Sequence, residues 1–124
     1  MQRRRFAHMN PSALFIINSD PRTNPRPAEA VRIAAGVGSW KKVDVTVCLC
    51  EASVLALGEF VDGLADEDNF TLYLPLVGEF GRPIYVETGA PFLKDLGQSP
   101  VKFERISVSK LAEMAAKSTY VLRF

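Results

Sequence analysis

The chain has 124 residues and a mass of 13.7 kDa, a size typical of one globular domain. Hydrophobic residues make up 48% and charged residues 23%, proportions that exclude wholesale disorder, a collagen-like chain and a small domain built on disulfides. The 15 Lys and Arg against 14 Asp and Glu argue against nucleic acid as the main partner, because binding to phosphates needs a clear basic excess.

Residues 1–12 are expected to form a flexible basic arm, and residues 13–124 a single α/β domain. Arg3, Arg4 and Arg5 lie in this arm, so the rest of the chain is mildly acidic. Two interpretations of the arm stay open: a frayed, solvated terminus, as chain ends commonly are, or a tail that contacts an anion or a membrane. Met9 is an alternative start of translation.

No stretch of the sequence predicts export or insertion into a membrane. Residues 1–12 lack the apolar core of a signal peptide, and no apolar run approaches the ~20 residues that span a bilayer. The chain is therefore expected to be cytoplasmic, with no membrane partner. Cys48 and Cys50 agree with a reducing compartment, because a disulfide between residues two apart is strained and rare.

The first part of the chain predicts two strands around a helix. The apolar run 13–18 is typical of a strand that is buried on both faces. Three prolines in residues 21–27 exclude regular structure there, and Pro27 is expected to open a helix that leaves Arg26 outside. Segment 43–50 alternates as a strand does, with Val43, Val45, Val47 and Leu49 on one face and Asp44, Thr46, Cys48 and Cys50 on the other.

The remainder predicts helices and strands in turn. The expected elements are a short helix over 52–57, an acidic loop over 62–69, a helical segment over 70–80 that Pro75 starts, kinks or splits, a strand over 83–87, a short helix over 91–97, a strand over 101–106, a helix over 110–117 capped by Ser109, and a strand over 120–124.

Strands that alternate with helices indicate a parallel sheet with right-handed crossovers. We therefore predict an α/β fold: a five-stranded, mainly parallel, doubly wound sheet with helices on both faces. In such folds ligands bind beyond the carboxyl ends of the strands, where the strand order reverses.

Three predicted loops leave those strand ends with polar or reactive groups. The candidate ligand-binding residues are Ser19, Asp20, Arg22, Glu51, Glu87 and Thr88, and the candidate catalytic group is the Cys50 thiol, whose pKa a following helix N-terminus would lower. Structural interpretations stay open beside these: Ser19 and Asp20 as turn formers, Cys48 as a small buried apolar residue, and Thr88 as a helix cap.

Several familiar catalytic sites are excluded by residue type and position. Gly36 and Gly38 lie at the end of a predicted helix, so they form no dinucleotide-binding turn. His8 is the only histidine and lies in the arm, which argues against a Ser-His-Asp or Cys-His site. A Cys-x-Cys pair without histidines lacks the ligands for zinc. No metal and no cofactor are expected.

Segments spread along the chain resemble the DsrE/DsrF-like family, which includes the TusD-type sulfur-relay proteins. The resemblance covers nearly the whole chain after Ala13. The segments that show it are, in order, Ile17–Pro21, Ala28–Ala35, the strand Val45–Leu49, Leu76–Gly81 before Ile84–Val86, and the closing Leu111-Ala-Glu with Tyr-Val-Leu. The resemblance implies a flavodoxin-like fold and assembly into oligomers, often trimers or hexamers. Relay members carry a persulfide on a cysteine just after the third strand, and the matching segment 86–91 contains none, with Glu87 or Thr88 in that place.

Two main hypotheses about function follow. The first is a non-catalytic, oligomeric DsrE-like module that binds a small ligand or a protein partner at the carboxyl edge of the sheet. The alternative is a sulfur-relay protein that uses Cys50 as persulfide acceptor and meets a sulfur-carrier protein; an unrelated enzyme of doubly wound topology is the third. Oligomerisation is expected independently, because one helix can bury only part of the apolar set Phe70, Leu72, Tyr73, Leu74, Leu76 and Phe80. The alternative is that these residues form a thick internal layer over the sheet.

Overall fold

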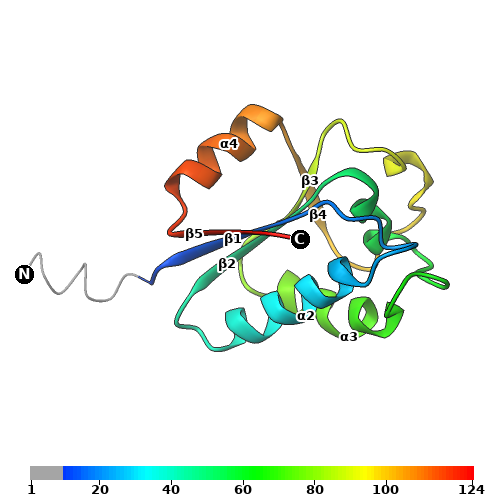
Figure 1. Cartoon of the computed structure of the whole chain (residues 1–124), viewed down its shortest axis with the longest axis horizontal. Coiled ribbons are helices and arrows are strands. Elements are labelled where there is room, and N and C mark those ends of the chain that lie inside the picture. The colour runs from blue at the N-terminus through cyan, green and yellow to red at the C-terminus, as the bar shows by residue number, and fades with distance from the viewer. Residues whose placement is uncertain (1–9) are drawn as a thin grey trace, which may run out of the picture.

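A computed structural model describes residues 10–124 and contains a five-stranded sheet in the order β4-β3-β2-β1-β5 (Figure 1). Every neighbouring pair of strands is parallel. The bounds are β1 Ser12–Ile17, β2 Asp44–Leu49, β3 Ile84–Glu87, β4 Phe103–Ile106 and β5 Tyr120–Arg123. The predicted fold class is therefore confirmed.

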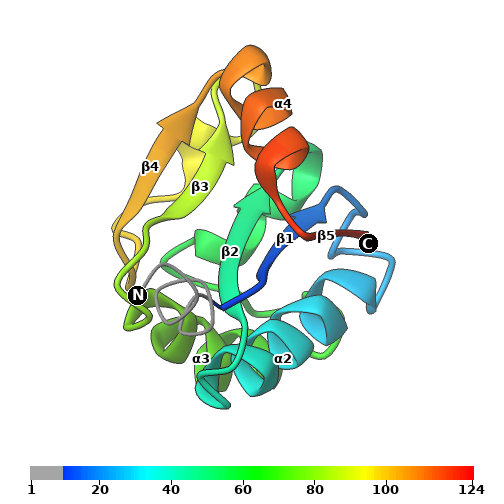
Figure 2. The same ribbon diagram turned by 90° about the vertical axis from the view of Figure 1, so that its left-hand side faces the viewer.

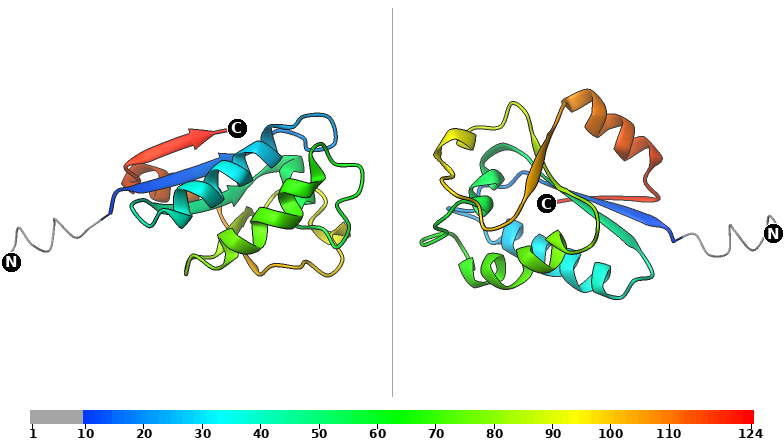
Figure 3. Two further views of the ribbon diagram at one scale, coloured as in Figure 1. Left: turned by 90° about the horizontal axis from the view of Figure 1, so that it is seen from below. Right: turned by 180° about the vertical axis from the view of Figure 1, so that it is seen from behind.

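Helices cover both faces of the sheet. One face carries α2 (Arg26–Ser39) and α3 (Glu67–Gly78), which lie side by side across it (Figure 3). The other face carries α4 (Val108–Lys117), which crosses from the β4 side of the sheet to the start of β5 (Figure 2). Two short 3-10 helices, η1 (Glu51–Leu57) and η2 (Leu93–Asp95), follow β2 and β3.

The larger core cluster lies between the sheet and the α2–α3 layer. The alternating pattern of β2 predicts it, because Val45, Val47 and Leu49 all point into this cluster. From α2 come small side chains such as Ala30 and Ala34, which allow the helix to approach the sheet closely. Phe70 and Leu74 of α3, together with Val54 and Leu57 of η1, complete the same layer.

A smaller core cluster lies beneath α4. The opposite set of side chains from β1 and β2 points into it, namely Leu14, Ile16, Cys48 and Cys50, and Leu111 of α4 and Ile106 of β4 close it. Because β1 fills both clusters, it is apolar at every position after Ser12, as a central strand of a parallel sheet should be.

Two predicted helix starts were wrong. Arg26 lies inside α2, because the side-chain oxygen of Asn24 accepts the Arg26 N–H at 2.9 Å and Pro25 already has helical backbone angles. The cap of α4 is Ser107 and not Ser109: the Ser107 hydroxyl accepts the Lys110 N–H at 3.2 Å. Ser107 takes this role because β4 ends at Ile106, which leaves it as the first residue before the helix.

The predicted acidic loop differs from the structure, because residues 67–69 belong to α3. Pro75 lies inside this helix, which excludes the predicted start and split but not the predicted kink. A proline there removes one helical hydrogen bond, which would have gone to the carbonyl of Thr71. Both residues are exposed, so that carbonyl stays open to solvent. The predicted helix over 91–97 is a single short turn, η2.

The boundary of the predicted arm lies earlier than expected. Ser12 is the first residue of β1, and its N–H donates to the Thr119 hydroxyl at 2.9 Å. Pro11 accepts the Asp44 N–H through its carbonyl, and the Asn10 side chain donates to the Lys41 carbonyl. The rest of the predicted arm lies outside the described residues. Within residues 10–124, no helix has the length and apolar character needed to cross a bilayer.

Candidate functional site

The carboxyl ends of β1, β2 and β3 lead into the three loops that carry the candidate residues. Since these strands are parallel, Ser19, Cys50 and Thr88 all follow the same edge of the sheet. They nevertheless belong to three separate places: Cys50 lies on the α4 side of the sheet, Thr88 beside η2, and Ser19 beside Phe124 between β1 and β5.

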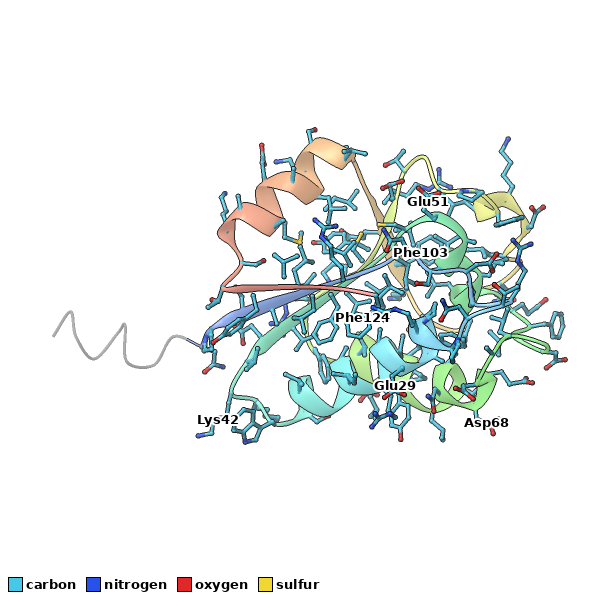
Figure 4. The ribbon with its side chains drawn as sticks, in the orientation of Figure 1. Glu29, Lys42, Glu51, Asp68, Phe103 and Phe124 are labelled. Atoms are coloured by element: carbon cyan, nitrogen blue, oxygen red, sulfur yellow. The ribbon has the colours of Figure 1, made fainter. Side chains whose placement is uncertain are left out.

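The place on the α4 side is a pair of thiols. Cys48 and Cys50 point to the same face of β2, and their sulfur atoms lie 3.8 Å apart. Both are free thiols, and only 3% of Cys50 is exposed. Glu51 directly follows this pair and is labelled in Figure 4, on the α4 side of the sheet. Side chains alternate between the two faces of a strand, so Cys48 and Cys50, which are two residues apart, lie on the same face.

The two thiols differ in acidity. A hydrogen bond with Cys50, followed by burial, raises the pKa of Cys48 far above that of an ordinary thiol. The same hydrogen bond lowers the pKa of Cys50, because it stabilises the Cys50 thiolate, and this effect outweighs burial and the nearby carboxylates of Glu87 and Glu51. Cys50 is therefore the sulfur of the pair that ionises first.

A buried serine holds the backbone around Cys50. The Ser53 hydroxyl lies 2.6 Å from the carbonyl oxygens of both Ile17 and Cys50, to which it donates. The Cys50 N–H donates to the Ile17 carbonyl at 2.8 Å, so Cys50 stays tied to β1 although β2 has ended. Glu51 has a positive φ of 53°, which turns the chain sharply from the strand into η1.

The loop after β1 reaches the segment after β3 through Arg22. The Arg22 guanidinium pairs with the Asp20 carboxylate at 2.8 Å and holds the pKa of Asp20 below its usual value. The same guanidinium lies over the ring of Phe92, 4.9 Å from its centre. Phe92 has a positive φ of 68°, so its placement depends on an unusual backbone conformation.

A hollow of about 350 Å³ opens beside this contact. It lies between the segment after β3 and the end of β4, and its lining consists of Thr88, Ala90, Phe92, Leu93, Lys94, Asp95 and Arg105. Two cationic side chains therefore face it against one carboxylate. A larger hollow of about 480 Å³ lies at the opposite, amino edge of the sheet, beneath the end of α3 and away from every candidate residue.

The structure separates the predicted site residues. Thr88 lines the hollow and Arg22 flanks it through Phe92, whereas Cys50, Glu87 and Glu51 lie together on the α4 side. The Thr88 hydroxyl and N–H both donate to the Ile106 carbonyl at 3.0 Å, so this residue also ties β3 to β4.

Ser19 lies where the strand order reverses, between β1 and β5. This place is filled by Phe124, whose carbonyl accepts the N–H groups of Asn18 and Ser19. The Phe124 ring stacks on Phe15 at 5.8 Å and lies between the sheet and α2 (Figure 4). Arg26 covers the outer side of the same ring. The reversal point that the fold predicts as a crevice is thus occupied by the chain's own aromatic side chain.

Sequence reasoning placed Ser53 in the polar loop after β2 without giving it a role, and it missed Phe92, Lys94 and Arg105. Two of these residues could have been found from their positions near strand ends. Ser53 lies one turn after β2, and Arg105 lies one residue before the end of β4. The sequence gives no indication of the positions of Lys94 and Phe92. The direction of their segment depends on the positive φ of Phe92, which the sequence does not predict. Among residues 10–124, no group of three or more His, Cys, Asp or Glu side chains is arranged to hold a metal ion.

Comparisons with known proteins give one kind of match. No family model matches the chain, and no curated protein matches it. Among solved structures, the crystal structure of the ychN protein from E. coli superimposes with a TM-score of 0.74 and 17% sequence identity, covering 94% of this chain and 100% of that one. The ychN protein has a DsrE-like fold, and at this low identity the likeness concerns the fold alone. This chain therefore has a DsrE-like, flavodoxin-like α/β fold.

Proposed function

We propose that this chain is a binding module that takes a small anionic ligand at the carboxyl edge of its sheet. The observation that carries the proposal is the hollow beside η2, whose lining includes two cationic residues, Lys94 and Arg105. A volume of about 350 Å³ falls in the range of small-molecule pockets.

The charges of the lining favour an anion over a cation. Arg105 presents a planar guanidinium that suits a carboxylate or a phosphate, and Lys94 adds a second positive charge. Asp95 is the one carboxylate of the lining. The neighbouring Arg22 is neutralised by Asp20, so its contribution is to hold Phe92 in place rather than to attract the ligand.

Thermal unfolding with added ligand tests this proposal. Inorganic phosphate and succinate serve as probes, and we expect each to raise the Tm of the wild type in a concentration-dependent way. R105Q and K94Q should lose most of that rise, whereas K110Q on the exposed side of α4 should keep it. A rise that R105Q, K94Q and K110Q share equally, or no rise in the wild type, contradicts the proposal.

We also propose a second candidate function, persulfide transfer through Cys50. It is supported by the hydrogen bond from Cys48, which favours the nucleophilic thiolate of Cys50 at the end of β2. In this reaction the Cys50 thiolate attacks the outer sulfur of a donor persulfide, a new sulfur–sulfur bond forms, and the donor leaves as a thiolate.

Incubation with a low-molecular-weight persulfide, followed by peptide mass mapping, tests this second function. We expect the added sulfur on Cys50 in the wild type and no added sulfur on Cys48 in C50S. A map in which Cys50 stays unmodified while the protein remains folded removes persulfide transfer as a function of this chain.

A further inference from the structure

The buried thiol pair carries an inference that depends on neither proposed function. We propose that Cys48 and Cys50 form a dithiol–disulfide redox couple, in which Cys50 attacks an oxidant and Cys48 resolves the product. The geometry points to this role because the two thiols lie on one face of a strand with their sulfur atoms 3.8 Å apart, in direct contact.

The positions of the two residues assign the roles. Cys48 lies inside β2, opposite Ile16 on one side and Tyr85 on the other. Cys50 lies beyond the last ladder residue of β2 and begins the turn into η1. Cys50 is therefore nearer to the edge of the sheet and to an approaching small oxidant, whereas Cys48 is held behind it.

The cover over the pair contributes few buried side chains. Beneath α4, the cluster that contains both thiols has six buried members, and Leu111 is the one buried residue of α4 itself. The remaining α4 side chains are half-buried or exposed. Local opening of a helix held by so few buried contacts gives a small peroxide access to Cys50.

The resulting disulfide would be strained and readily reduced. The backbone of Cys48 is fixed by strands on both sides, and the Cys50 N–H is bonded to the Ile17 carbonyl at 2.8 Å. The chain cannot relax freely when the two sulfur atoms approach to about 2.05 Å. Strained disulfides have more oxidising potentials, which is typical of reversible rather than structural pairs.

The chemistry balances with hydrogen peroxide as the oxidant. The Cys50 thiolate attacks one peroxide oxygen, so that a sulfur–oxygen bond forms, the oxygen–oxygen bond breaks and water leaves after protonation. The Cys48 sulfur then attacks the Cys50 sulfur, so that the disulfide forms, the sulfur–oxygen bond breaks and a second water leaves with the Cys48 proton. Two thiols lose two electrons in total, and one peroxide becomes two waters.

Peroxide treatment followed by dimedone trapping and mass spectrometry tests the couple. We expect the wild type to lose the mass of two hydrogen atoms, to resist dimedone and to recover with dithiothreitol. In C48S, Cys50 should stop at the sulfenic acid and take up dimedone, and in C50S the remaining Cys48 should react at least ten-fold more slowly.

Three results would overturn the couple: a wild type that takes up dimedone on Cys50 as C48S does, a disulfide that joins two chains, or thiols that stay unmodified in every variant. Circular dichroism of each variant shows whether the fold is retained, and C48A and C50A replace the serine variants if it is not. In C48S no resolving thiol can displace sulfide from a Cys50 persulfide, so persulfide mapping in that variant separates failure of the redox couple from failure of persulfide transfer.

Discussion

The hydrogen bond between Cys48 and Cys50 decides which sulfur is reactive. Removing the donor should raise the pKa of Cys50, because burial and the carboxylates of Glu87 and Glu51 then act on its thiolate without compensation. The direction in which the Cys50 pKa changes therefore depends on the contacts of the Cys50 sulfur atom.

We predict that Cys48→Ala moves the pH profile of Cys50 alkylation upward, because the thiolate loses the hydrogen bond that lowers its pKa. The rate of iodoacetamide modification between mild acid and mild alkali measures the midpoint. Cys48→Ser should move the profile less, because a serine hydroxyl still donates to the thiolate. Coincident profiles for all three proteins would show that the pair shares no proton.

The sequence predicted part of the site at this scale and missed the rest for a physical reason. Alternation along residues 43–50 assigned both cysteines to one face, and the parallel fold assigned Ser19, Cys50 and Thr88 to one edge. Which way each loop turns after its strand depends on backbone angles such as those of Glu51 and Phe92. These are positive at residues that carry side chains, so no propensity rule predicts them.

At the scale of elements, α4 differs from α2 in how it is held. Seven residues of α2 are buried, whereas α4 buries Leu111 alone among its ten residues. Leu111 packs in one cluster with Leu14 and Ile16 of β1. The stability of α4 on the sheet therefore depends strongly on one side chain.

We predict that Leu111→Ala lowers the free energy of unfolding by about 2 kcal/mol, the lower end for a leucine truncated at the border of a core. Amide hydrogen exchange should rise across α4 more than across α2. Val108→Ala is the matched control, because Val108 is 67% exposed, and it should change stability by less than about 0.5 kcal/mol. Equal losses of stability in both variants would contradict this account of α4.

Most elements were predictable because their signals are local. The apolar run of β1, the alternation of β2 and the glycines after α3 and η2 each depend on a few neighbouring residues. The start of α2 was misplaced because Pro25 already has helical backbone angles, and the Asn24 side chain accepts the Arg26 N–H. The start of α4 was misplaced because β4 ends at Ile106, which makes Ser107 rather than Ser109 the cap.

At the scale of the whole molecule, the outer side of α3 remains apolar. Phe70 and Leu74 are buried and Tyr73 and Phe80 pack against the core, whereas Leu72 and Leu76 stay 61% and 42% exposed. These two residues lie four apart and share one side of the helix. Their exposure supports the proposal that this surface meets a second copy of the chain.

We predict that the wild type is oligomeric and that the double substitution L72K/L76K shifts it toward monomer, because burying two charges in an apolar interface is unfavourable. Multi-angle light scattering across a range of concentrations measures the mass. V121K, at an exposed position of β5, is the control and should leave the mass unchanged. A wild type that is monomeric at high concentration would remove oligomer formation from the account.

The position of β1 has a consequence for how the chain is made. β1 lies between β2 and β5, yet β5 follows every other strand in the chain. A nascent polypeptide therefore carries an unpaired backbone edge on β1 until β5 emerges from the ribosome. Loss of β5 by proteolysis recreates that state, and the uncovered backbone of β1 becomes a template for aggregation.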